Sequence, residues 1–298
     1  MKYIVMLIAC GILWGSQYVV NAIALESLSA IWIAALRSSI GAIVLIFACL
    51  ALGLKREKGH WPLLFVIGLL EATLPFLLVA WGQQTTAASH AAVITGMNPL
   101  LTILLAPFFL VNARLDAKAV LCGIVGFISL LYLFYPQLQV QEVTEFYGAS
   151  AIFIAALSFA LSLILVKRLQ HLHPIVVARD VIVLSALQLL PIALFTSDLS
   201  LADMSARSAY ASLYLGVFCG GVVYILFMQL IMSKGPEFAS FSNYLVPTVG
   251  VILSFLVQGD EVTSRTFISL AGIIGAIFLF QYWSNKSKSP TNELVQNT

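Results

Sequence analysis

Residues 62–81 read PLLFVIGLLEATLPFLLVAW, a stretch that contains one charged side chain, Glu71, and no lysine or arginine. The hydrocarbon core of a bilayer is about 30 Å thick and needs about 20 apolar residues in a helix. Only helices and closed barrels pair every backbone polar group inside lipid. This stretch therefore predicts a transmembrane helix.

The rest of the chain has the same character. Of its 298 residues 61% are hydrophobic and 9% are charged, and the mean hydropathy is +1.01. An average soluble domain carries about 25% charged residues, so a water-soluble fold of this length has too little interior for so much apolar surface. The net charge is only +2 and the basic residues fall in short loops. The expected partner is a lipid bilayer, and nucleic acid is not expected to bind.

Breaks at charged residues, proline and glycine divide the chain into ten predicted spans. The first apolar run continues to Leu25, which is too long for a cleaved signal peptide, so we expect a retained helix. Residues 285–298 are rich in Ser, Asn and Lys and predict a disordered cytoplasmic tail. The predicted spans cover residues 3–25, 29–53, 62–81, 87–110, 118–135, 147–167, 174–196, 208–231, 236–258 and 266–284.

The basic residues predict the orientation of these spans, because short cytoplasmic loops are enriched in Lys and Arg. With the N-terminus inside, Arg207 and Arg265 lie outside and Arg37 and Arg179 lie within spans. All other basic residues lie inside, and shifting the parity by one helix would destroy this separation. Both termini are therefore predicted to be cytoplasmic. The inside set is Lys2, Lys55, Arg56, Lys58, Arg114, Lys118, Lys167, Arg168, Lys234, Lys286 and Lys288.

An internal repeat is visible in the same spans. Residues 121–127, LCGIVGF, match residues 270–276, LAGIIGA. Pro99 corresponds to Pro247 and Gly68 to Gly216, each pair 148 residues apart. Each half would hold five spans, an odd number, so the second half would cross the membrane in the opposite sense. Inverted repeats place a binding site near the midplane of the membrane, between the halves.

The predicted fold class is an all-α membrane protein with ten transmembrane helices, arranged as two inverted five-helix repeats around a central cavity. The first repeat is expected over residues 1–136 and the second over residues 147–284. Gly123, Gly126, Gly272 and Gly275 in the closing helices are expected to allow close helix packing, within the chain or against a second copy.

Several short motifs resemble the drug/metabolite transporter superfamily, specifically its EamA-type ten-helix branch. They are Trp14-Gly15-Ser16, Ala34-Ala35-Leu36-Arg37 and the segments 91–99 and 239–247. The resemblance covers about residues 3–284. It implies a cavity lined mainly by the first, third and fourth helices of each half, and transport of amino acids, other metabolites or toxic compounds, often outward. The sixth span departs from the pattern, since Ala156-Leu157-Ser158 replaces Trp-Gly-Ser.

Glu71 is the clearest candidate for a functional residue. An ionisable side chain in the middle of a bilayer costs at least about 2.5 kcal/mol, so it needs a partner or a water-filled cavity. A carboxyl group facing a cavity can take up and release a proton, which makes Glu71 a candidate for proton coupling and for substrate binding. The alternative is a protonated carboxyl that hydrogen-bonds a neighbouring helix and holds the bundle together.

Polar side chains on other spans add substrate-binding candidates. On the first span, Trp14, Gln17, Tyr18 and Asn21 follow the spacing i, i+3, i+4, i+7 and share one helical face. We expect that face to line the cavity, although helix–helix hydrogen bonding is an equal alternative for Asn21. The fourth span offers His90, Met97 and Asn98 beside Pro99, which should kink the helix. The candidates on the second half are Tyr224, Ser240, Asn243 and Tyr244.

The two intramembrane arginines are not counted among the substrate-binding candidates. Arg37 and Arg179 each lie one or two turns inside a span, where a long side chain can reach the interface. Structural pairing with helix ends or with Asp180 is the favoured interpretation, and direct anion binding is the alternative. Four cysteines, Cys10, Cys49, Cys122 and Cys219, fall in apolar runs without metal-ligand spacing, so neither a metal nor another cofactor is expected.

These features predict a secondary transporter that moves a small, amino-acid-like metabolite outward across the inner membrane by alternating access. The alternative cargo is a toxic compound or a nucleoside-type molecule. A membrane-embedded lipid-modifying enzyme is disfavoured, because no HExxH, GxSxG or Walker motif and no carboxylate cluster occurs in the sequence. The expected partners are a small-molecule substrate and lipid, with proton or ion coupling and a monomeric or homodimeric state left open.

Overall fold

The computed structural model describes residues 1–55, 59–86, 88–110, 115–135, 143–197, 204–246, 248–249 and 264–287. Regular secondary structure in these ranges is entirely helical, which confirms the predicted all-α membrane fold class. Six described helices are long and apolar enough to cross a membrane, and three shorter apolar helices accompany them. The six are Lys2–Ala24, Ala30–Ala51, Trp61–Gly82, Phe146–Leu169, Pro174–Thr196 and Ala206–Lys234.

The first five predicted spans form helices close to the expected boundaries. The third is interrupted in its middle by one π-helical turn, Leu69–Thr73, which joins α3 to α4. The sequence did not predict this change of helix type. The elements are α1 (Lys2–Ala24), α2 (Ala30–Ala51), α3 (Trp61–Gly68), α4 (Leu74–Gly82), α5 (Ala88–Thr95), α6 (Asn98–Phe109) and α7 (Ala117–Phe134).

The eighth predicted span also contains a π-helical segment, Leu215–Val222. Residues 242–246 of the ninth span continue as helix after α12, whereas Pro247 and residues 250–263 lie outside the described residues. The last helix continues to Ser287, so residues 285–287 of the predicted tail are helical. The elements are α8 (Val143–Val166), α9 (Pro174–Thr196), α10 (Ala206–Tyr214), α11 (Val223–Lys234), α12 (Pro236–Ser240) and α14 (Ser264–Ser287).

The fourth predicted span is divided where a kink was expected. Helix α5 ends at Thr95, Gly96 and Met97 form a turn, and α6 begins at Asn98 with Pro99 in its first turn. Proline has no backbone N–H to donate and fits the first turn of a helix. Pro99 therefore starts a new helix, and α5 and α6 are separate elements.

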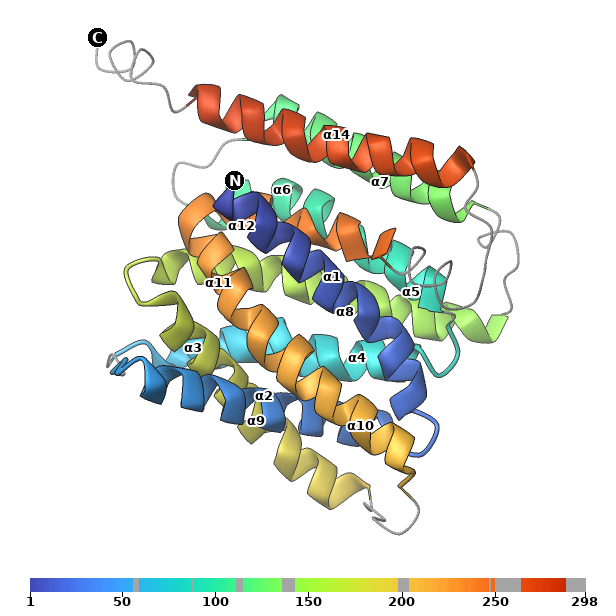
Figure 1. Ribbon diagram of the computed structural model, residues 1–298, viewed down its shortest axis with the longest axis vertical. Helices are drawn as coiled ribbons and strands as arrows, with labels where there is room; N and C mark the ends of the chain where they lie inside the picture. The colour runs from blue at the N-terminus through green and yellow to red at the C-terminus, as the bar shows by residue number, and fades with distance from the viewer. Residues whose placement is uncertain are drawn as a thin grey trace.

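Helices from the two halves of the chain pack against one another throughout the bundle. Helix α2 lies along α9, α1 along α10 and α11, α4 along α8, and α6 contacts α12. Helices α7 and α14 lie side by side as a pair at the upper edge of the bundle in Figure 1. The interior between the halves is consequently shared by residues far apart in the sequence.

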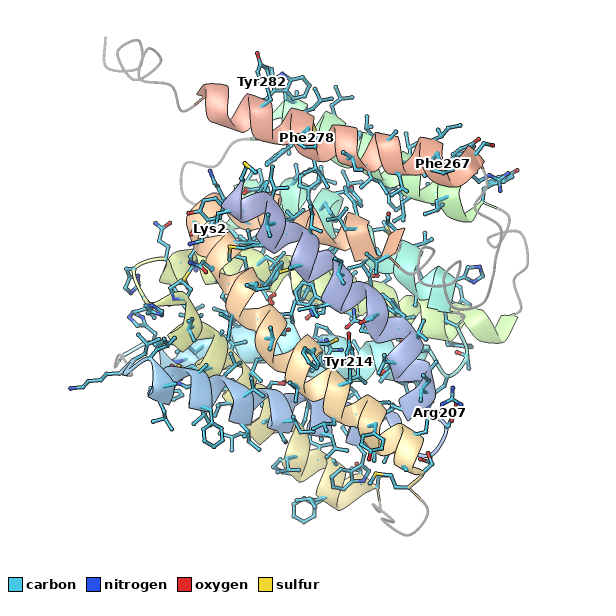
Figure 2. All side chains as sticks on the ribbon, viewed as in Figure 1. Lys2, Arg207, Tyr214, Phe267, Phe278 and Tyr282 are labelled. Atoms are coloured by element: carbon cyan, nitrogen blue, oxygen red, sulfur yellow. The ribbon has the colours of Figure 1, made fainter. Side chains whose placement is uncertain are left out.

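The outward-facing side chains of the helices are largely apolar. On α14, Phe267, Phe278 and Tyr282 project from the molecule and are more than half exposed (Figure 2). Phe108 and Phe195 are more exposed still, at 82% and 90%. In a soluble protein such a surface would aggregate, but it suits contact with lipid.

Helix ends meet in two separate groups. In one group, Arg168 Nη2 donates to the carbonyl of Phe109 at 2.8 Å, and His171 Nε2 lies 3.2 Å from His60 Nε2. In the other, Arg207 forms an ion pair with Glu26 at 3.3 Å, and Trp32 Nε1 donates to the carbonyl of Ser197 at 2.9 Å. Lys2 and Arg207 lie toward opposite ends of α1 in Figure 2. The first group contains ends predicted to be cytoplasmic and the second contains ends predicted to be external.

Candidate substrate-binding site

A pocket lies between the two halves of the bundle. It contains about 490 Å³ of unfilled space, including the part that opens to the outside. Residues from α1, α2, α4, α5, α6, α8 and α11, from the π-helical turn Leu69–Thr73 and from the helical residues 242–246 contribute to its wall. Seven of the twelve predicted substrate-binding residues line it: Trp14, Gln17, Tyr18, Glu71, Asn98, Tyr224 and Asn243.

The other five predicted residues do not line this pocket. Asn21 donates to Gln83 Oε1 at 2.9 Å, so it makes the helix–helix hydrogen bond considered as its alternative role. Tyr244 donates to the carbonyl of Gly123 at 2.6 Å and so ties its own segment to α7. Ser240 bonds the carbonyl of Glu237 within its own helix. His90 is buried on α5, and Met97 lies in the turn between α5 and α6.

Glu71 is held in the π-helical turn at the wall of the pocket. Its side chain is fully buried, and the hydroxyl of Ser162 on α8 donates to carboxyl oxygen Oε2. The other carboxyl oxygen, Oε1, has no hydrogen-bond partner in the described part of the chain. The hydroxyl of Tyr224 donates to the Glu71 backbone carbonyl at 3.2 Å. The backbone and one carboxyl oxygen are thus fixed by protein donors, while the second oxygen is buried without a protein donor.

Aromatic rings form much of the remaining wall around Trp14. The ring of Trp14 packs edge-on against Phe159 at 5.6 Å and against Tyr224 at 5.9 Å between centroids. Phe159 in turn stacks on Phe227 at 5.7 Å. Such edge-to-face contacts fix ring orientation as well as burying apolar area. This part of the pocket is suited to the apolar portion of a small molecule.

Polar side chains on α1 and α6 also line the pocket. The hydroxyl of Tyr18 lies 2.5 Å from Thr95 Oγ1, which links α1 to the end of α5. Asn98 Nδ2 donates to the carbonyl of Ala156 at 3.3 Å, and its Oδ1 accepts from Thr102. These groups already have protein partners, so a ligand would exchange or share their hydrogen bonds. Their positions are set by helix packing.

Arg37 is the main residue at the pocket that the sequence did not place there. It lines the pocket, whereas Arg179 forms the expected ion pair with Asp180 at 2.8 Å. Phe76 and Phe159 were also missed, because an apolar residue in an apolar span carries no signal of what it faces. For Arg37 the available signal was a buried cation with no acidic neighbour in its own span.

Nothing in the described ranges forms a group of three or more His, Cys, Asp or Glu side chains arranged to hold a metal ion. The four cysteines are all buried. The wall of the pocket combines a carboxyl group, a guanidinium group, amides, hydroxyls and aromatic rings. Apolar walls with a few placed polar groups are typical of small-molecule sites.

Comparison with known proteins identifies the class. The EamA-like transporter family matches residues 1–135 and again residues 146–282, so the chain belongs to this family. It is a multi-pass membrane transporter of the drug/metabolite transporter type, as the sequence motifs suggested. These matches point to transport rather than enzymatic catalysis.

Individual relatives are similar along most of the chain. The uncharacterized inner membrane transporter YedA of Escherichia coli K12 is 27% identical over 284 residues, which are 92% of this chain and 88% of YedA. The uncharacterized transporter YoaV of Bacillus subtilis is 19% identical and covers 96% of this chain and 99% of its own length. A solved crystal structure with 17% sequence identity superposes with a TM-score of 0.79 over 94% of this chain and 98% of its own, so it has the same fold.

Proposed function

We propose that this protein exports a small, amino-acid-like metabolite across the inner membrane by alternating access, with Glu71 as the proton-coupling group. The observation that carries the proposal is a fully buried carboxyl group whose second oxygen is unpaired, on a residue that lines a pocket between two packed halves. A buried carboxyl without an ionic partner is costly unless it exchanges a proton or meets a ligand. The inner-membrane location is supported by the relative YedA.

Alternating access is supported by how the helices pair. If the chain is an inverted repeat, each contact should have a counterpart after the halves are exchanged. Contacts of α1 with α10 and α11 correspond in this way to contacts of α8 with α3 and α4. The pairs α2 with α9 and α7 with α14 correspond to themselves. Such pseudosymmetry allows one fold to open to either side of the membrane around a fixed site.

The proposed orientation places both termini in the cytoplasm. Helix ends that the basic residues assign to the inner side contact one another, as Arg168 does with Phe109. Ends assigned to the outer side also meet, as Arg207 does with Glu26. The arrangement therefore agrees with the charge pattern of the loops. Side-specific labelling of single cysteines near Lys55 and Lys167 would contradict it if the two positions reacted from different sides.

The proposal is tested with purified protein in proteoliposomes. Wild-type protein should accumulate a substrate found by counterflow against its gradient when a pH gradient is imposed. Glu71→Gln keeps the shape of the side chain but cannot release a proton, so uphill accumulation should fall to background while folded protein remains in the membrane. Glu26→Gln, on the exposed carboxylate paired with Arg207, is the matched control and should accumulate substrate normally. Unchanged uphill transport in Glu71→Gln would remove Glu71 from the coupling mechanism.

A further inference from the structure

The guanidinium group of Arg37 is buried at the pocket wall and is only partly satisfied. Arg37 is 7% exposed, and its Nη2 donates to the backbone carbonyl of Cys219 at 3.0 Å. The guanidinium carbon lies 3.8 Å from the centroid of the Phe76 ring. Its Nε has no hydrogen-bond partner in the structure as described. The Phe76 ring therefore holds one face of the guanidinium group and the Cys219 carbonyl holds Nη2, while the Nε–H donor has no partner.

No acidic side chain in the described ranges forms an ion pair with Arg37, in contrast to Arg179, which pairs with Asp180, and Arg207, which pairs with Glu26. Glu71 lines the same pocket, but its carboxyl group bonds Ser162. A buried cation that lacks a counter-charge is costly, and a guanidinium fork matches the geometry of a carboxylate. The position thus has the chemistry of an anion receptor that is incomplete without its ligand.

We propose that Arg37 binds the carboxylate of the transported molecule, so that the substrates of this protein are carboxylate-bearing metabolites. The inference rests on the proposed transport function and specifies its cargo. A zwitterionic amino acid fits further, since the unpaired Glu71 oxygen can accept from its ammonium group. The aromatic wall around Trp14 would then contact the apolar part of the side chain.

This assignment discriminates among the three cargo classes that the sequence analysis left open. A toxic organic cation would bring a positive charge toward the buried guanidinium group, which is unfavourable in a low-dielectric site. A nucleoside carries no carboxylate to complete the fork. Only the amino-acid-like class supplies both an anion for Arg37 and a donor for Glu71.

The test uses a panel of L-amino acids in three forms: the free acid, the methyl ester and the amine that lacks the carboxylate. Tetraphenylphosphonium represents the organic cations. Binding to purified protein is measured by thermal shift, followed by titration, for wild type, Arg37→Gln, Arg37→Lys and Arg207→Gln. Arg207 is an exposed arginine paired with Glu26 and serves as the matched control.

At least one free acid should stabilise the wild type, and its ester and amine should bind more weakly. Arg37→Gln should weaken binding of the acid about tenfold or more, because a hydrogen bond to a charged group is lost. Arg37→Lys keeps the charge without the fork and should fall between, which shows that the site is still folded. Arg207→Gln should bind as the wild type does.

Equal binding of acid and ester, or unchanged binding in Arg37→Gln, overturns the inference. So does stabilisation of the wild type by tetraphenylphosphonium alone. Counterflow by the wild type separates this result from the transport proposal. Counterflow of a cation or neutral compound would leave transport intact and remove the carboxylate assignment, whereas Arg37-dependent binding without counterflow would do the reverse.

Discussion

The π-helical segments Leu69–Thr73 and Leu215–Val222 lie at corresponding places in the two halves but carry different groups. Glu71 and Cys219 are 148 residues apart, the same spacing as Gly68 and Gly216 in the sequence repeat. The first segment presents an acid to the pocket. The second presents a backbone carbonyl, since that of Cys219 accepts from both Trp14 Nε1 and Arg37 Nη2.

The two segments also differ in how closely they approach their neighbours. The first is held by hydroxyl groups of α8, with Ser158 bonding the Leu70 carbonyl at 2.7 Å and Ser162 bonding the Glu71 carboxyl. The second is glycine-rich, and Gly220 lies directly against the backbone of α2. A π-helical turn often marks a functional site. One segment thus positions the Glu71 carboxyl group, and the other brings α2, with Arg37, close to the pocket.

The largest effect on stability is expected from adding a side chain at the close contact between the second segment and α2. A Cβ atom at Gly220 would lie 2.7 Å from the carbonyl oxygen of Arg37, and backbone cannot move aside as a side chain does. Gly220→Ala should therefore lower the free energy of unfolding by about 1–3 kcal/mol, the usual range for overpacking. The measurement is thermal denaturation of the detergent-solubilised protein.

Gly275→Ala on α14 is the matched control for Gly220→Ala. A Cβ at Gly275 meets nothing within 4 Å in the described part of the molecule. Alanine is also the better helix former by about 1 kcal/mol, so this variant should be as stable as the wild type or more so. Equal losses in both variants would show that Gly220 is not a point of close approach.

The first segment is probed by removing the hydroxyl that holds Glu71. Ser162→Ala leaves both carboxyl oxygens without a protein donor, and an unsatisfied buried polar group costs about 1–3 kcal/mol. The loss of stability should be smaller than in Gly220→Ala, because a protonated carboxyl group can turn toward the pocket. The loss of stability in the double variant Glu71→Gln, Ser162→Ala should be less than the sum of the losses in the two single variants. Full additivity of the losses would mean that the two residues are not coupled.

The sequence could predict the membrane helices because their signal is the length of an apolar run. The seventh span was expected at residues 174–196 and α9 covers Pro174–Thr196. Helix type was not predictable, since an i→i+5 pattern in a uniformly apolar stretch leaves no trace in the periodicity. The full count of ten spans stays a prediction, because residues 250–263 lie outside the described ranges.

The candidate site was predictable only where polar residues would otherwise face lipid. The stripe on the first span and Glu71 stood out for that reason, and Trp14, Gln17, Tyr18 and Glu71 do face the pocket. The sequence singled out Arg37 but favoured a structural role for it, and it could not reveal its partner, the backbone carbonyl of Cys219, which lies 182 residues away. Backbone partners and aromatic walls come from tertiary packing, which a single sequence does not reveal. Whether these residues bind substrate stays a prediction for the experiments above.

The smallest expected effect concerns the hydrogen bond that joins the two segments. The hydroxyl of Tyr224, just after the second segment, donates to the backbone carbonyl of Glu71 in the first at 3.2 Å. Tyr224→Phe keeps the ring and its contact with Trp14 but removes this donor, so the loss of stability should be about 0.5–1.5 kcal/mol. The measurement is again thermal denaturation, with uphill transport assayed in parallel.

The transport rate of Tyr224→Phe distinguishes two roles for the hydrogen bond between the segments. If the Tyr224 hydroxyl only holds the bundle together, Tyr224→Phe should transport at the wild-type rate once the protein is folded. If the bond must break and reform as the halves exchange access, the rate should change by more than the stability does. An unchanged stability and an unchanged rate together would mean that the two segments act independently. Glu71 in the first segment and the Cys219 carbonyl that holds Arg37 in the second would then not depend on each other.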